Sequence, residues 1–515
     1  MTNIASSVTF ASVRGQAPDS PLDVPEILME ISSYLSPRDV HSCLHVNRNF
    51  HTTFASVFWR YVQLGPNRRA AFVTLNSVRS HAHQVQSLIV TWDPTLFCGP
   101  YLSLNFAVLN ELQIKAQIPK RPLRSYSLDK EPATFLLRHR SMIRTLTVSN
   151  YIFGSNTLTF WKNAAQLQAL STLELDNITL NGEVVGDLVL KVFATLQSLQ
   201  LARVHFTNLK PSVLLDSESD LKKIELQGCF FDFDSLRAIC RLLKISGALR
   251  VLVWGPWTML RKKGQAPGSS APLTGILSQG LPWNDLKRLD VCRLEGVRVK
   301  NMFEALTPGV PELTLYQISL SKEAKVALLG SFAGKLTRVN LEFCEGLESA
   351  TVHDLLCSCN NLLSVSVDTP LLASSVMQSS APWVCRQLQE WKISIEMDEG
   401  EGDDDERAGA HHMFERLSQL EQLRVLNVSS TYARLGEDVF FLTFREDQGV
   451  RCLSSLLQMK VLNVRHTRQE VGGGDWRWLL QTFRGLRSVV GLRVASGEEV
   501  AWQAALARRA IAYSR

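Results

Sequence analysis

LTRVNL, at residues 336–341, has apolar residues at its first, fourth and sixth positions. The same spacing recurs from residue 85 onward, in segments such as LSTLEL (170–175), LKRLDV (286–291) and MKVLNV (459–464). Successive copies lie 24 to 37 residues apart, and most intervals are close to 26. A fixed period of this length indicates a chain built from stacked structural repeats.

Each copy ends in alternating apolar and polar residues, which predicts a short strand, and helical patterns such as Ser349–Cys359 lie between the strands. Strand plus helix in about 26 residues resembles the leucine-rich repeat. LEFCEGL (341–347) and CNNLLSVSV (359–367) resemble its cysteine-containing class. The resemblance implies an α/β solenoid shaped as a horseshoe, with parallel strands inside, helices outside and a ladder of leucines between them.

Residues 21–61, PLDVPEILMEISSYLSPRDVHSCLHVNRNFHTTFASVFWRY, predict a short all-helical module ahead of the repeats. Apolar residues recur at helical spacing over Glu26–Leu35 and again after Val40. Between them, Ser36 can cap a helix and Pro37 suits its first turn. About 40 residues cannot bury this much apolar surface alone, so part of it must contact the repeats or another protein.

This module resembles the F-box, on Val24-Pro25-Glu26-Ile27-Leu28, Tyr34–Val40 and Phe58-Trp59-Arg60. Asn47 and Phe50 depart from the pattern, since cysteine and tryptophan are common there. The resemblance implies contact with a Skp-type adaptor, and through it a cullin. The residues expected to make the adaptor contact are Val24, Pro25, Ile27, Leu28, Ile31, Leu35, Val40 and Trp59.

An F-box followed by leucine-rich repeats is similar to the substrate-recognition subunits of Skp–cullin–F-box (SCF) ubiquitin ligases. Such a subunit is not itself an enzyme, and it holds an unknown protein substrate near the catalytic subunits. The alternative is an interaction scaffold outside any ligase, whose N-terminal helices only cap the solenoid.

The expected organisation is a disordered leader (1–20), an F-box-like domain (21–62), a linker helix (63–84) and the repeat domain (85–515). Three insertions interrupt the repeat period. Loops are predicted near 255–282, which contains Pro, Gly and Ser, near 397–410, which is acidic, and near 432–450.

The side chains between the anchors of each strand are expected to point to solvent on the concave, inner side of the solenoid. Their charges alternate in sign, with an apolar pair midway, as at protein-binding hot spots. A solvated face without a ligand is the competing interpretation. The candidate substrate contacts are Lys223, Glu225, Val251, Val253, Arg288, Asp290, Tyr316, Arg338 and Glu342. A small-molecule sensor would need a basic pocket, and these inward positions do not cluster Lys or Arg.

Composition excludes several other classes. The net charge of +6 is spread thinly, so neither nucleic-acid nor membrane binding is expected. Ten cysteines in 515 residues indicate a reduced chain in the cytoplasm or nucleus rather than a disulfide framework. No apolar run is long enough to span a bilayer.

Neither a cofactor nor a metal is expected. His353, Cys357 and Cys359 lack a fourth ligand with the spacing of a zinc site. The glycines at 472–474 precede a helix without the lysine of a phosphate loop, and no hydrolase motif occurs.

Overall fold

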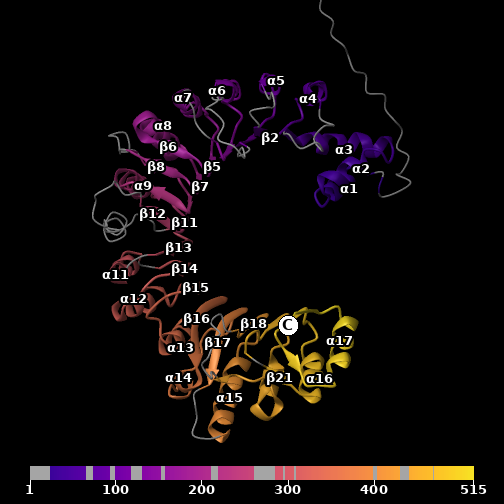
Figure 1. Cartoon of the computed structure of the whole chain (residues 1–515), viewed down its shortest axis with the longest axis vertical. Helices are drawn as coiled ribbons and strands as arrows, with labels where there is room; N and C mark the ends of the chain where they lie inside the picture. Colours follow the sequence, from indigo (N-terminus) through magenta and orange to yellow (C-terminus); the bar gives the residue numbers. More distant parts are fainter. Residues whose placement is uncertain are drawn as a thin grey trace, which may run out of the picture. The chain divides into compact units, whose positions relative to one another are not determined.

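The computed structural model describes residues 22, 24–64, 74–92, 99–116, 130–151, 157–209, 218–259, 285–293, 296–306, 309–397, 403–429, 440–467 and 469–514. The predicted leader (1–20) and most of the predicted loop at 255–282 lie outside this part. The chain divides into two compact units, Met1–Leu170 and Ser171–Arg515 (Figure 1).

The first unit begins with three helices, α1 (Pro25–Ser32), α2 (Pro37–Cys43) and α3 (Arg48–Arg60). The Ser36 and Asn47 side chains cap α2 and α3 by accepting the backbone N–H of Asp39 and Phe50. Leu28, Val40 and Phe54, one from each helix, form their shared core. Capping and core burial together explain why so short a segment holds three helices.

The rest of the first unit alternates short helices with parallel strands. The strands pair in chain order: β1 with β2, β2 with β3, and β3 with β4. They are β1 (Tyr61–Leu64), β2 (Ser87–Trp92), β3 (Glu111–Ala116) and β4 (Thr145–Ser149). The helices are α4 (Leu75–His81), α5 (Gly99–Leu102), α6 (Lys130–Arg138) and α7 (Thr157–Ala164). Helix α4 falls within the predicted linker helix.

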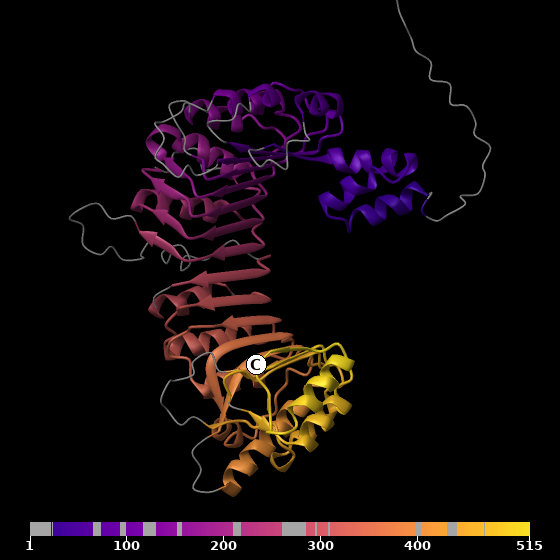
Figure 2. The ribbon, with the colours of Figure 1, turned by 45° about the vertical axis from the view of Figure 1, so that its right-hand side comes forward.

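The second unit continues the same alternation in a parallel sheet whose strands pair in chain order, seen as a stack of arrows in Figure 2. These strands are β5 (Thr172–Asp176), β7 (Ser198–Ala202), β9 (Lys223–Gln227), β11 (Val251–Trp254), β13 (Arg288–Cys292), β14 (Glu312–Tyr316), β15 (Arg338–Leu341), β16 (Ser364–Leu372), β17 (Glu390–Met397), β18 (Val425–Asn427), β20 (Val461–Asn463), β22 (Ser488–Val490) and β24 (Ala512–Ser514).

The helices of the second unit cover one face of this sheet (Figure 1). They are α8 (Gly182–Thr195), α9 (Phe233–Ile245), α11 (Gly296–Ala305), α12 (Lys322–Phe332), α13 (Ser349–Ser358), α14 (Ala373–Met377), α15 (Asp403–Ser418), α16 (Gly473–Thr482) and α17 (Glu499–Arg508), with 3₁₀ turns η4 (Glu446–Gln448) and η5 (Val450–Ser455). The repeat anchors lie between helices and strands. Leu173, Leu201, Leu289 and Leu313 are all buried there. The predicted α/β solenoid of parallel strands with outer helices is therefore confirmed.

A sharp turn ends several strands of this unit. The residue immediately after the strand has a positive φ at Asn177, Arg203, Gly228, Arg293 and Gln317. This left-handed turn leads, after three of these strands, into a second small parallel sheet. That sheet contains β6 (Thr179–Asn181), β8 (His205–Thr207), β10 (Cys229–Phe231) and β12 (Trp257–Met259), and a further pair joins β21 (Glu470–Val471) to β23 (Arg493–Val494).

All three predicted loops contain regular structure. Within 255–282, Trp257–Met259 form β12, which pairs with β10, so the loop prediction is wrong for these residues. Within 397–410, Met397 ends β17 and helix α15 begins at Asp403, so the loop prediction is wrong for Asp403–Ala410. Acidic residues favour a helix N-terminus, and Ala410, Met413, Phe414 and Leu417 form a buried helical face. Within 432–450, β19 (Phe440–Phe441) pairs antiparallel to β17, and η4 follows.

Candidate protein-interaction surfaces

The N-terminal module buries some of the predicted adaptor contacts in its own core. Leu28 and Val40 are 1% and 4% exposed, so their side chains pack between the helices. Val24, Ile31 and Leu35 are half-buried, whereas Pro25 and Ile27 are exposed. Ile27 and Ile31 lie one helical turn apart on α1, which places them on one side of the helix. A partner could therefore reach Pro25, Ile27 and Ile31 without unfolding the module.

Trp59 has a different environment from the other predicted contacts. Its indole stacks on the imidazole of His81 in α4, with ring centroids 4.3 Å apart and planes inclined by 4°. Helix α3 also continues directly into β1, which pairs with β2. These contacts attach the module to the first repeats, and the structure assigns Trp59 to that attachment.

Apolar side chains outside the predicted set are among the most exposed in the module. Tyr34 is 81% exposed, Val46 is 60% exposed, and Met29 is also exposed. They lie on α1 and in the two turns that follow α1 and α2. Their positions off the regular apolar face could have identified them in the sequence, since an apolar side chain outside the buried stripe of an amphipathic helix has no core to enter. Together with Ile27 they form the module's exposed apolar set.

The predicted substrate contacts lie along β9 to β15, as expected, but their charges are largely satisfied by one another. Lys223 pairs with Glu225 at 3.1 Å, and Arg288 pairs with Asp290 at 2.6 Å. The hydrogen bonds that Arg288 donates to Asp290 raise the pKa of the Arg288 guanidinium above its usual value. Because each cation already has a carboxylate, this region offers little free charge to a ligand.

The other predicted contacts on these strands are also engaged. Arg338 lies 3.8 Å from the carboxylate of Glu312, and Glu342 accepts a 2.6 Å hydrogen bond from the Ser366 hydroxyl. Tyr316 packs edge-on against Phe343, with ring centroids 4.9 Å apart. Val251 is half-buried and Val253 is buried, which limits the apolar spot expected midway along the sheet.

A buried hydrogen-bonded cluster occupies the position where the sequence placed His353, Cys357 and Cys359 close together. The Trp383 indole N–H donates to His353 Nδ1 at 3.2 Å, and His353 Nε2 lies 3.4 Å from Cys357 Sγ. Burial lowers the pKa of His353, which keeps the ring neutral. Since the Nδ1 lone pair accepts the indole proton, Nε2 carries the hydrogen and has no lone pair for a metal.

Five other described cysteines are buried core residues: Cys229, Cys240, Cys292, Cys344 and Cys385. Cys229 and Cys344 donate to the carbonyl oxygens of Leu201 and Leu315 in the preceding repeat, at 3.3 and 3.4 Å. Burial raises the pKa of both thiols to about 11, so neither is a reactive thiolate. Within the described residues the cysteines are free, and no cluster of His, Cys, Asp and Glu could hold a metal ion.

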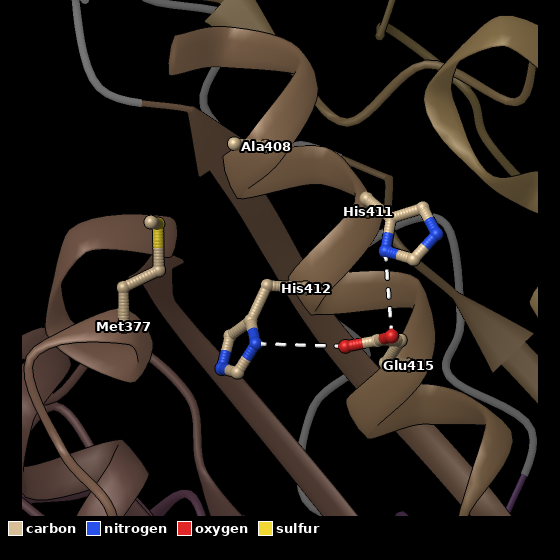
Figure 3. Close-up of a pocket in the computed structure, with 5 residues that line it drawn as sticks. All are labelled: Met377, Ala408, His411, His412 and Glu415. Atoms are coloured by element: carbon tan, nitrogen blue, oxygen red, sulfur yellow. Dashed lines mark ion pairs between the residues drawn. The ribbon is translucent and has the colours of Figure 1, made fainter.

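An open pocket of about 350 Å³ lies between α14 and α15 (Figure 3). Met377, Ala408, His411, His412 and Glu415 line it. His411 and His412 approach the two oxygens of the Glu415 carboxylate, at 3.5 and 3.8 Å. Both imidazoles therefore share one carboxylate, and this pocket does not assemble a metal site.

Within the described part of the chain, no helix has the length and apolar character needed to cross a membrane. The chain matches no protein-family model. A search of curated proteins likewise finds no relative.

Proposed function

We propose that this chain is the substrate-recognition subunit of an SCF-type ubiquitin ligase. The N-terminal module docks a Skp-type adaptor, and the repeat strands hold a protein target. The observation that carries the proposal is a capped three-helix module, with apolar side chains left exposed, joined to a parallel α/β solenoid.

The exposed apolar set supports a docking role for the module. A module that only capped the solenoid would be expected to bury its apolar side chains against the repeats. Instead, Ile27 is 40% exposed and Tyr34 is 81% exposed. The repeat strands supply what a receptor also needs, a rigid surface whose side chains are presented at regular spacing. Neither part requires catalytic residues, since the proposed role is to bring the target close to other subunits.

The Trp59–His81 stack and the continuity of α3 with β1 favour a second candidate, a scaffold outside any ligase whose helices cap the repeats. The two roles differ in what the exposed residues do. Docking requires Ile27, whereas capping requires only the core and the Trp59 contact.

The test is co-purification of the full chain with a Skp-type adaptor, comparing Ile27→Asp with Val500→Asp. Both residues are exposed and lie in the first turn of a helix, but Val500 belongs to α17. An aspartate in a first turn suits the helix dipole, so both variants should fold. We expect Ile27→Asp alone to weaken adaptor binding, by about tenfold or more. Equal binding by wild type and both variants would assign the adaptor contact to another surface.

A further inference from the structure

The residues that precede β18, β20 and β22 in the second unit form a row of positive charge. The Lys460 N–H donates to the Arg424 carbonyl at 2.7 Å, and the Arg487 N–H donates to the Lys460 carbonyl at 2.7 Å. Arg424, Lys460 and Arg487 therefore lie side by side on neighbouring strands, about 4.8 Å apart along the sheet. We call these three residues the basic row.

The basic row is not neutralised within the described part of the protein. Arg424 and Arg487 are exposed and Lys460 is half-buried, and no ion pair joins any of them to a described carboxylate. Glu421 lies three residues before Arg424, and Glu390 is the register neighbour of Val425. Glu390 already accepts a 3.0 Å hydrogen bond from Ser364. The cations one position further along, at the start of β9, β13 and β15, do pair with neighbouring acids.

A row of hydrogen-bond donors lies three residues further along the same strands. Lys392, Asn427 and Asn463 are register neighbours on β17, β18 and β20, and we call them the donor row. The Oδ1 atom of Asn427 accepts the Ser429 N–H at 3.0 Å, and that of Asn463 accepts the Arg465 N–H at 3.0 Å. Since these bonds occupy the amide oxygens, the Nδ2 groups remain as the free ends of both side chains, and they can only donate.

We propose that the basic row and the donor row together bind an extended acidic segment of a partner protein. Carboxylates are acceptors only, so they complement a surface that presents cations and amide N–H groups. Between the rows lie the half-buried Val425 and Val461, which offer apolar contact to a peptide. No aromatic side chain occurs at the register positions of either row, so the base stacking that favours single-stranded nucleic acid is missing.

The chain contains its own matched control. Lys222, Arg250 and Lys287 precede β9, β11 and β13 and are linked by the same backbone hydrogen bonds, at 2.8 and 2.7 Å. The row beside them, however, contains Glu225 and Asp290 where the C-terminal strands have the donor row. Those carboxylates would repel an acidic segment, so the inference assigns binding to the C-terminal strands alone.

The test measures fluorescence anisotropy of a labelled ten-residue peptide of alternating Glu and Ala, titrated with the full chain at low salt. We expect wild type to bind the peptide. The variant Arg424→Glu/Lys460→Glu/Arg487→Glu should bind it at least about tenfold more weakly. Lys222→Glu/Arg250→Glu/Lys287→Glu makes the same change in net charge and should alter binding by less than about twofold.

A second variant changes the donor row without touching the basic row. Asn427→Asp/Asn463→Asp keeps an oxygen that can accept the Ser429 and Arg465 N–H groups, so the turns should persist while both outward donors become acceptors. We expect weaker peptide binding with an unchanged circular dichroism spectrum. Absence of peptide binding to wild type, equal losses in the two Glu triple variants, or tighter binding of an oligonucleotide with the same charge would each overturn the proposal.

This inference deepens the proposed receptor role by naming the class of partner. The peptide titration needs no adaptor, so its failure would leave adaptor docking intact. Conversely, a chain that binds the peptide but no adaptor would support the scaffold role.

Discussion

Replacing His353 by leucine should loosen the repeat that contains α13 and β16. The substitution roughly preserves the side-chain volume. It removes the acceptor of the buried Trp383 indole N–H, whose Nε1 lies 3.2 Å from His353 Nδ1. A buried donor left without a partner costs about 1–3 kcal/mol. Hydrogen exchange of the amides in α13 and β16 measures the free energy of local opening directly, which suits a repeat protein better than one global transition.

A double-mutant cycle with Trp383→Phe isolates the hydrogen bond. The phenylalanine removes the donor, so the double variant leaves no orphaned indole N–H. We expect the double variant to cost less than the sum of the single variants, by about 1 kcal/mol. Additive costs, or a His353→Leu variant with the opening free energy of wild type, would refute the assigned hydrogen bond.

The same cluster predicts a dependence on pH. Burial lowers the pKa of His353 below its usual 6.5 in the folded state, so the unfolded state binds the proton first. The stabilisation by neutral His353 is therefore complete above pH 6.5 and is lost as the pH falls through the folded-state pKa. His353→Leu should show a weaker loss of protection in α13 and β16 over that range.

Three further substitutions test the fold. Phe54→Ala empties the centre of the N-terminal module, where Phe54 is fully buried, and should cost about 3–5 kcal/mol, seen as faster hydrogen exchange in α1–α3 with β5–β24 unchanged. Ser36→Ala removes the N-cap of α2 and should cost about 1 kcal/mol of stability in the same module. Ser42→Ala, inside the same helix and not at its cap, is the comparison. Gly182→Ala would place a Cβ 2.3 Å from the Asn208 carbonyl oxygen and should cost more than 1 kcal/mol, whereas Gly247→Ala meets no atom within 4 Å and should change thermal stability little.

The sequence predicted the repeat strands because their anchors obey a local rule. Val339 and Leu341 alternate with outward residues within a single strand, and the same pattern recurs in each copy. Helix α15 was not predicted because its first residues are acidic, a composition typical of a solvated loop. The buried apolar face of the helix begins only at Ala410.

The interaction surfaces were less accessible to sequence reasoning. Arg424, Lys460 and Arg487 lie far apart in the chain, and only the register of β18, β20 and β22 makes them neighbours. Their common signal is their place, one residue before the strand, which is a position outside the anchor pattern. In the N-terminal module the apolar periodicity identified Leu28 correctly as part of a helical face, but that face is the module's own core.

The most direct test of the proposed function is co-expression of the full chain with a Skp-type adaptor, followed by size-exclusion chromatography of wild type, Ile27→Asp and Val500→Asp. The proposal predicts a one-to-one complex for wild type and Val500→Asp, and for Ile27→Asp a smaller complex peak with free adaptor eluting separately. Separate elution of the adaptor from a folded wild-type chain would contradict the ligase role and leave a repeat scaffold capped by its N-terminal helices.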